Sequence, residues 1–395
     1  MLSSLRVLDL TWVLGGPFAG QVLAELGAEI IKIESPEGDQ SRAYPPYYFE
    51  GDSSFFLSVN RGKKSVVINL KSGQGREVFY DLVRQCDAVM YGFVPDVPAR
   101  LGIDFQALKK INPRIVVGQL IGLHDEAPYA TQPSFDIIAQ ALGGIMSITG
   151  EANGRPTRVG YQVADLAAGL YLANGILAGV IHALKMGVGK KIQISLLDCQ
   201  LAMLTWQAQN YFVSGDIPKA SGTRHPMLAP SEVFNCADEK YVAISATTEQ
   251  FWQPFCKAID APELASDPRF TSSELRIKNV AALAEELARI FACFTCKDAV
   301  ARLERARVPV GPVNNVADAL AQPLASIRHM VENLSHPMSG VLLKFLGNPF
   351  KYDGAEPLDY PPKLGAHTAD VLAKLCGYDA TTLQNLHAQG AIKLG

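Results

Sequence analysis

The first part of the chain alternates between short apolar runs and amphipathic runs, and this alternation constrains the fold more than any other feature. Five apolar runs predict strands, at residues 5–10, 29–34, 65–70, 88–91 and 114–118. The runs between them predict helices at residues 18–26, 73–86 and 105–111. A buried parallel strand is apolar throughout because helices cover both of its faces. The pattern therefore predicts a Rossmann-like α/β domain with a mostly parallel sheet, whose ligands bind beyond the carboxyl ends of the strands.

The pattern changes after residue 213. Loop-forming residues at 214–230 precede strands expected near 233 and at 241–245, and helices expected at 250–259 and 280–294. The tail contains a strand-like run at 340–344 and two helical runs at 368–376 and 381–389. The resulting prediction is a large domain (1–213), a linker (214–230), a smaller α+β domain (231–310), a second linker (311–336) and a C-terminal return to the large domain (337–395).

Composition narrows the class of protein. The 395 residues are 48% hydrophobic and 19% charged, with a net charge of -3. Such a chain can bury a sizeable core, but it has no broad positive field to attract nucleic acid or an anionic membrane. The N-terminus lacks the features of a signal peptide. We expect a cytoplasmic enzyme without nucleic-acid or membrane partners.

One segment, residues 163–186, is apolar enough to suggest a membrane span. It carries Asp165, Asn174, His182 and Lys185, and alanine and glycine fill much of the rest. Small residues with interspersed polar groups suit a helix packed inside a protein better than one facing lipid. We expect a core helix.

The seven cysteines are scattered and odd in number, which does not indicate a disulfide framework. Cys293 and Cys296 form a Cys-x-x-Cys pair, but within a predicted helical run at 281–303 and without a second pair. We interpret both as packing residues and expect no metal site.

Two common catalytic or cofactor motifs are missing. Gly15-Gly16-Pro17 follows the first strand but departs from the G-x-G-x-x-G fingerprint, and Pro17 removes an amide from a phosphate cradle. The glycines still permit close approach of a ligand to the backbone, although a simple helix-starting turn is the alternative. No G-x-S-x-G elbow is present, and the most suggestive histidine is His225, on a loop beside Arg224.

Asp165 is the most interesting acidic residue, at the start of the long apolar helix. The helix dipole would stabilise its anion there by roughly 0.3–1 kcal/mol. An apolar setting would also reduce its hydration and make it more nucleophilic. The alternative is an ordinary N-cap aspartate. Local chemistry leaves both interpretations open.

Several segments, in order along nearly the whole chain, resemble the class III CoA transferases, the family of formyl-CoA transferase and carnitine CoA-transferase. The matching segments are residues 7–11, 16–19, 26–34, 38–39 with Arg42, 60–65, 135–140, Asp165, 308–313 and 364–368. The segments 58–65 and 310–315 are similar to the succinate-hydroxymethylglutarate branch of that family. The resemblance implies an interlocked homodimer.

The resemblance implies that Asp165 is the nucleophile of a CoA transfer. Coenzyme A then enters as a thioester substrate, and no tightly bound cofactor is expected. The carboxylate would form an aspartyl anhydride and then an aspartyl-CoA thioester, which an acceptor acid attacks. The residues implied to contact CoA are Trp12, Val13, Leu14, Gly15, Ile68, Lys71, Gly92, Phe93, Arg100 and Phe135. Lys71 and Arg100 suit the CoA phosphates as charge partners, with solvated surface cations as the alternative.

The chain departs from formyl-CoA transferase at Leu14 and Phe135, where that enzyme has glutamine and tyrosine, and it lacks a glycine run at residues 223–230. These changes disfavour a small oxalate-like acceptor. The branch resemblance instead implies a succinyl-CoA donor and a small dicarboxylate-like acceptor. Residues that could hold the acceptor are Asp136, Arg42, Arg158, Arg224 and His225, although Asp136 could simply cap the helix that follows.

Two alternative functions share the expected fold. An α-methylacyl-CoA racemase would move a proton, and its pattern places a histidine where this chain has Phe135. A CoA-binding paralogue without turnover is disfavoured by the presence of Asp165.

Overall fold

The computed structural model describes all 395 residues, and the chain forms two compact units. The first consists of Met1–Ile145, Arg158–Gly215 and Ser326–Gly395, and the second of Met146–Thr157 and Asp216–Ala325. Each unit has its own hydrophobic core. The segment Met146–Thr157, expected in the large domain, belongs to the second unit, where the Gly222 amide donates to the Gly150 carbonyl at 3.0 Å.

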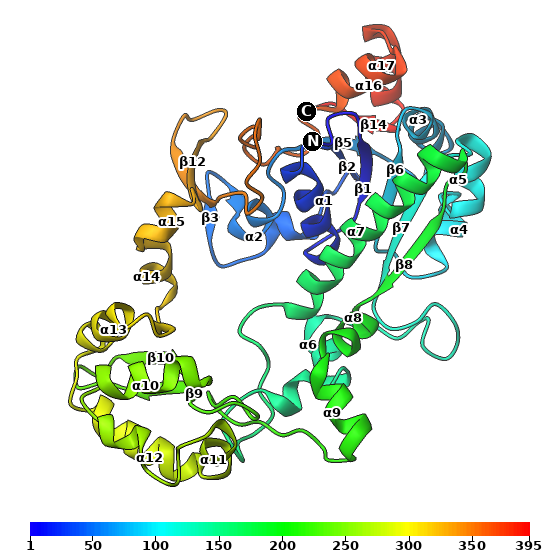
Figure 1. Cartoon of the computed structure of the whole chain (residues 1–395). Helices are drawn as coiled ribbons and strands as arrows, with labels where there is room; N and C mark the ends of the chain where they lie inside the picture. The colour runs from blue at the N-terminus through cyan, green and yellow to red at the C-terminus, as the bar shows by residue number, and fades with distance from the viewer. The chain divides into compact units, whose positions relative to one another are not determined.

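A seven-stranded sheet forms the centre of the first unit (Figure 1). Its strands are β1 (Arg6–Leu10), β2 (Glu29–Glu34), β5 (Lys63–Ile68), β6 (Ala88–Tyr91), β7 (Val116–Ile121), β8 (Lys191–Ser195) and β14 (Ile392–Lys393). They lie in the order β14-β5-β2-β1-β6-β7-β8. All pairs are parallel except β14 with β5. The predicted parallel α/β sheet is confirmed.

The strand order reverses direction at β1. From β1 the chain proceeds outward through β2 to β5, and it then crosses back to β6 on the other side of β1. Leu10, the last residue of β1, pairs with Tyr91, the last residue of β6. This is the topological switch point of a doubly wound sheet, outside which such folds bind their ligands.

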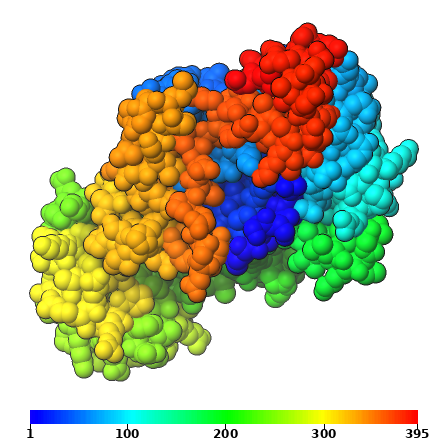
Figure 2. All heavy atoms as spheres, turned by 90° about the horizontal axis from the view of Figure 1, so that it is seen from above, coloured from blue at the N-terminus to red at the C-terminus, as the bar shows by residue number.

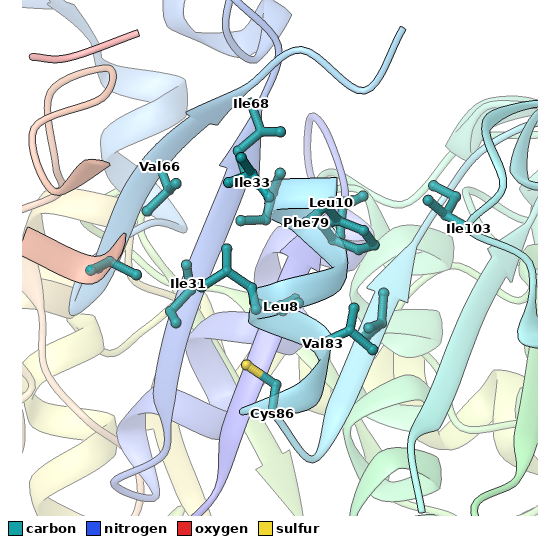
Figure 3. Close-up of a cluster of buried hydrophobic side chains, with 14 of the residues drawn as sticks. Leu8, Leu10, Ile31, Ile33, Val66, Ile68, Phe79, Val83, Cys86 and Ile103 are labelled. Atoms are coloured by element: carbon teal, nitrogen blue, oxygen red, sulfur yellow. The ribbon is translucent and has the colours of Figure 1, made fainter. Parts of the chain in front are cut away.

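Helices cover both faces of this sheet. On one face lie α1 (Gly15–Glu25) and α7 (Val163–Met186); on the other lie α3 (Gly73–Arg84), α5 (Phe105–Ile111) and α16 (Thr368–Cys376). Consecutive strand residues therefore enter different cores, Val7 with α1 and α7 and Leu8 with α3. Figure 3 shows the second of these cores, where Leu8, Leu10, Ile31, Ile33 and Phe79 meet.

Shorter elements complete the first unit. They are β3 (Tyr48–Phe49), β4 (Asp52–Ser53), α2 (Ser54–Ser58), α4 (Val97–Leu101), α6 (Asp136–Leu142), α8 (Leu196–Met203), α9 (Trp206–Ser214), β12 (Val331–Ser335), β13 (Leu342–Leu346) and α17 (Ala380–Ala388). The C-terminal segment packs against β5 and α3, and Figure 2 shows it in red beside the light-blue segments. The His367 amide, for example, donates to the Ser65 carbonyl at 3.0 Å.

The second unit is a small antiparallel α+β structure. Its strands β9 (Ser231–Asn235), β10 (Tyr241–Ser245) and β11 (Val310–Pro312) form one sheet. The helices are α10 (Glu249–Ala258), α11 (Ser273–Lys278), α12 (Val280–Phe291), α13 (Cys296–Arg305) and α14 (Val316–Ala321), with α15 (Pro323–Ile327) at the boundary of the unit.

The predicted single helical run at 281–303 is wrong. Helix α12 ends at Phe291 and α13 begins at Cys296, and the Thr295 side chain caps the new helix by accepting from the Asp298 amide at 3.2 Å. Cys293 is exposed between the two helices, whereas Cys296 is buried. All seven cysteines are free thiols.

Candidate active site at the switch point of the sheet

The loops that follow β1 and β6 meet at the switch point. The rings of Trp12 and Phe93 are in edge contact, with centroids 5.9 Å apart and an interplanar angle of 82°. Phe93 also stacks on Tyr91, with centroids 5.9 Å apart. The fold therefore brings together six of the residues expected to contact CoA: Trp12, Val13, Leu14, Gly15, Gly92 and Phe93.

The loop after β1 is held in an unusual conformation. Val13 has a φ of 68°, in the left-handed region that β-branched residues rarely adopt. The Val13 amide points to the Asp39 carboxylate, 3.3 Å away, and the Thr11 carbonyl accepts from Lys32 Nζ at 2.8 Å. Buried charged side chains thus fix the backbone on which a ligand would rest.

Those side chains belong to a network under the loop. Lys63 Nζ lies 2.9 Å from Asp9 Oδ2, and Lys32 Nζ lies 2.8 Å from Asp39 Oδ2, with all four side chains fully buried. Lys63 also donates to the Pro17 carbonyl at 2.8 Å, which ties the network to the first turn of α1. Burial, followed by the nearby charge of Lys32, lowers the pKa of Lys63 to about 8, although Asp9 opposes this shift.

Sequence reasoning gave this network no role in the site. A signal was nevertheless present, because Asp9 and Lys32 interrupt apolar strands that are covered on both faces. A charge in such a strand requires a buried partner of opposite sign. The sequence does not reveal which pairs form, because the partners are contributed by different strands and loops.

Helix α1 begins at Gly15, three residues before the predicted start at Phe18. A Cβ atom on Gly16 would lie 2.3 Å from Thr11 Cβ, so the turn into the helix requires glycine there. No side chain caps α1, and its first turn contains no acidic residue. The amides of this turn are therefore directed at the site, with the positive end of the helix dipole behind them.

Asp165 lies next to this uncapped turn. A Cβ atom on Gly15 would be 3.0 Å from the Asp165 carbonyl oxygen, and one on Gly169 would be 2.5 Å from the Gly15 carbonyl oxygen. The two helices pack through glycines, which lets their backbones approach closely. The N-terminal turns of α1 and α7 thus meet beside the switch point.

Asp165 is the third residue of α7, and the N-cap is Gln162. The interpretation of Asp165 as an N-cap is therefore wrong. Its half-buried carboxylate forms no hydrogen bond or ion pair within the chain. Burial, with a contribution from the negative charge of Asp136, raises the pKa of Asp165 to about 7. A carboxyl group with a strongly raised pKa at a ligand-binding edge is a candidate for catalysis.

Asp136 is buried at the first position of α6. Its Oδ1 accepts from the Ala164 amide at 2.9 Å, and its Oδ2 accepts from Gln140 Nε2 at 2.6 Å. Gln140 Oε1 in turn accepts from the Val159 amide at 2.9 Å. Both carboxylate oxygens are engaged within the protein, so this geometry gives no support to an acceptor-binding role.

The remaining residues expected to contact CoA differ in accessibility. The Ile68 side chain is buried in the core at the end of β5, which leaves only its backbone for a ligand. Lys71 is exposed just beyond it, and Arg100 is exposed with Asp96 3.3 Å away. The Phe135 side chain precedes α6 and is 70% exposed.

The basic residues expected at the acceptor have other partners in the structure. Arg42 donates to both oxygens of Glu34, at 2.8 and 2.7 Å, and to the Pro362 carbonyl at 3.0 Å, so each of its three side-chain nitrogens has a partner within the chain. Arg224 and His225 belong to the second unit, where Arg224 pairs with Glu232 at 3.2 Å. Arg158 is exposed and donates to the Val159 carbonyl. Their contact with an acceptor stays a prediction.

Loops that meet at the switch point of a doubly wound sheet, with an unpaired carboxyl group beside them, are the arrangement in which α/β enzymes place their active sites. The chain belongs to CoA-transferase family III, whose family model matches residues 2–368. The expected family is thereby confirmed, and with it the enzyme class.

Relatives cover almost the whole chain. It is 34% identical to the succinate–glutarate CoA-transferase of Agrobacterium fabrum, over 95% of both sequences. It is 38% identical to the acetyl-CoA:oxalate CoA-transferase of Acetobacter aceti, over 91% of this chain and 92% of that one. A crystal structure of a CaiB/BaiF family protein from Brucella suis superposes with a TM-score of 0.82 at 34% identity, covering 94% and 98% of the two chains.

Proposed function

We propose that this enzyme transfers CoA from succinyl-CoA to a small dicarboxylic acid, with Asp165 as the nucleophile. The observation that carries the proposal is the unpaired, half-buried carboxyl group of Asp165, with its raised pKa, where two helix N-termini meet. The relatives support dicarboxylate acceptors, since glutarate and oxalate both appear in their names. Leu14 and Phe135 favour the longer acid, because neither side chain offers a polar contact to oxalate.

The reaction proceeds through four exchanges at carbonyl carbons. A carboxylate oxygen of Asp165 attacks the succinyl thioester, the C–S bond breaks, and CoA leaves as the thiolate. The thiolate attacks the aspartyl carbonyl of the anhydride, which releases succinate and leaves an aspartyl-CoA thioester. The acceptor carboxylate attacks this thioester and expels the thiolate again. The thiolate then attacks the acceptor carbonyl, which yields the new acyl-CoA and free Asp165.

Each tetrahedral step develops a negative oxygen that needs a hydrogen-bond donor. The amides of Gly15 and Gly16, at the start of α1, are suited to this role because no side chain caps the helix. Pro17 has no amide to offer, so the first two residues of the helix carry the donation. Removing one preorganised oxyanion donor from an acyl-transfer enzyme costs about 2.7–4 kcal/mol of transition-state stabilisation.

The CoA moiety would lie across the switch point, on the Trp12–Phe93 ring pair, with its phosphates toward Lys71 and Arg100. Lys71 is exposed just beyond the carboxyl end of β5, and Arg100 is exposed in helix α4. Their exposure supports an interaction with a soluble polyanion. Attraction of this kind decreases with added salt.

We also infer a homodimer. Helices α7, α8 and α9 present exposed apolar side chains that include Leu184, Phe212 and Val213, which are 70%, 73% and 80% exposed. By length and composition alone α7 could cross a membrane, but one side of it packs against α1, β7 and β8. A large apolar surface on such a helix indicates contact with a second protein surface, and a second copy of this chain would supply one.

An acceptor panel tests the function. The purified enzyme is incubated with succinyl-CoA and glutarate, oxalate, acetate or no acid, and acyl-CoA products are identified by mass spectrometry. The proposal expects glutaryl-CoA and free succinate in equal amounts, with less product from oxalate and none from acetate. Acetyl-CoA replaces succinyl-CoA as a donor control. Absence of transfer from succinyl-CoA to any dicarboxylate would refute the proposal.

A further inference from the structure

The N-terminus of α7 is capped from another helix. Gln162, the residue at the N-cap position, forms no side-chain cap. The Ala164 amide instead donates, at 2.9 Å, to the carboxylate of Asp136, the first residue of the neighbouring helix α6. Ala164 immediately precedes Asp165, so the contact fixes the backbone turn that carries the reactive carboxyl group.

The Asp136 carboxylate is itself oriented by Gln140, which is fully buried one turn further along α6. The Gln140 amide group accepts from the Val159 amide through its oxygen and donates to Asp136 through its nitrogen. One side chain therefore connects the segment that leads into α7 with the acid that caps it. Each of the four polar atoms in this chain of contacts has a partner, as a buried polar network requires.

We propose that Asp136, oriented by Gln140, is a positioning residue that holds Asp165 in the geometry for attack on the thioester. The inference rests on the proposed nucleophilic role of Asp165, and it assigns Asp136 to α7 rather than to the acceptor acid. A carboxylate at this place has a second effect, because its charge lies close to the nucleophile. Burial is the larger cause of the raised pKa of Asp165, about 7, and the charge of Asp136 adds to it. Asp165 is therefore a stronger base than an isolated aspartate, and part of it is ionised at neutral pH.

No other charged group acts on Asp165 from the elements packed around it. Helix α1 has only Glu25, which lies at its far end near Arg61. Strand β7 has no charged residue. The charged residues of the neighbouring elements β8 and α8 are Lys191, near Asp125, and Asp198, in the first turn of α8. Asp136 is therefore the charged residue whose electrostatic interaction affects the pKa of Asp165.

Three variants test the role of Asp136. Asp136→Ala removes both its hydrogen bonds and its charge. Asp136→Asn retains an oxygen for the Ala164 amide but sets its new NH2 group against the NH2 of Gln140. Asp136→Asn with Gln140→Glu restores every hydrogen bond, because the new carboxylate accepts from both the new amide and the Val159 amide. Asp379→Ala is the control, since Asp379 caps the remote helix α17 through the Thr382 amide.

For each variant we would measure kcat, KM for succinyl-CoA and the pH profile. Asp136→Ala is expected to lower kcat by about 100-fold, the effect of a small misplacement of a reacting group. KM should change by less than about threefold, because only the reacting geometry is disturbed. The double variant should recover at least about tenfold of the lost kcat, because it restores the hydrogen bond that holds the Ala164 amide. Asp379→Ala should match the wild type.

A measurement without substrate keeps this inference separable from the proposed function. The effect of Asp165→Asn on unfolding is compared across pH in the wild-type and Asp136→Asn backgrounds. The midpoint of that pH dependence should shift to lower pH when the charge of Asp136 is removed. An unchanged kcat in Asp136→Ala would overturn the positioning role, and an unchanged midpoint would overturn the effect of the Asp136 charge on Asp165. If the wild type shows no transferase activity but the midpoint still shifts, only the proposed function is refuted.

Discussion

Gly15 and Asp165 are in backbone contact: a Cβ atom built on Gly15 would lie 3.0 Å from the Asp165 carbonyl oxygen. The loop expected to bind CoA and the helix that carries the reactive carboxyl group are therefore set directly against each other. Any side chain at position 15 must displace one of them by a few tenths of an ångström. The proximity depends on glycine, although nothing in the local sequence distinguishes Gly15 from an ordinary helix start.

Gly15→Ala should reduce kcat more than it reduces stability. Replacing glycine in a helix favours folding by up to about 1 kcal/mol, which offsets part of the strain. The displaced turn of α1, however, would no longer direct its amides at the reaction centre. We expect a loss of kcat of about tenfold or more with a small change in the free energy of unfolding.

Gly73→Ala is the matched control, because Gly73 is also the first residue of a helix but has nothing within 4 Å of its Cβ position. It should leave kcat unchanged. Equal kinetics for the two alanine variants would show that the contact between Gly15 and Asp165 has no catalytic consequence.

Asp165→Asn should stabilise the protein in a pH-dependent manner. The folded protein keeps the Asp165 proton up to about pH 7, whereas the unfolded chain releases it near the ordinary value of 3.8. Between these values the folded state binds more protons, so the stability of the wild type falls as pH rises from about 4 to 7. The variant has no such proton to lose. It should be more stable than the wild type by about 1–3 kcal/mol at pH 8, and by little at pH 4.

Chemical unfolding between pH 4 and pH 8.5 gives this difference directly. A constant difference over the whole range would mean that Asp165 titrates like an exposed aspartate, contrary to the environment described here.

The buried pair of Asp9 and Lys63 gives a third prediction. Lys63→Met leaves the Asp9 carboxylate without its ion-pair partner in the core, which should cost about 3–5 kcal/mol of unfolding free energy. Asp9→Leu should be destabilising for the same reason. The double variant removes both charges and should be more stable than either single variant. Thermal and urea unfolding test this, and a double variant as unstable as the sum of the two would exclude the pairing.

The sequence predicts the regular part of this fold well. Strands β2 and β6 and helix α5 have the bounds predicted from the sequence, residues 29–34, 88–91 and 105–111. A continuous apolar or amphipathic run shows directly which side chains are buried, so such elements can be located from the sequence. Strand β8 was missed since Lys191 and Gln193 alternate with isoleucines at the edge of the parallel sheet. The two-residue strand β14 exists only through its pairing with β5, a contact between sequence positions far apart.

The site was only partly predictable for the same reason. Asp165 and the loop at Trp12–Gly15 were identified through motifs that lie along the chain. The contact between Asp136 and Ala164 joins two helices, and the raised pKa of Asp165 depends on burial by residues from α1 and α6. Such properties arise only when the chain is folded, so local sequence suggested an N-cap where the structure has an unpaired acid.

Leu184→Glu tests the inferred dimer. A charge on the exposed apolar side of α7 should abolish association, because burying an unpaired carboxylate in an apolar contact is unfavourable. Sedimentation velocity should show a dimer for the wild type and a monomer for the variant. Ala281→Glu, which adds the same charge at an exposed position on α12, should remain dimeric. A monomeric wild type would contradict the inference.

Covalent trapping of Asp165 tests the central claim most directly. The enzyme is incubated with succinyl-CoA without acceptor, treated with hydroxylamine or borohydride, digested and analysed by mass spectrometry. We predict a modified Asp165 in the wild type and no modification in Asp165→Ala. Exchange of an α-proton in a branched acyl-CoA with Asp165 unmodified, or transfer that persists in Asp165→Ala, would contradict the account.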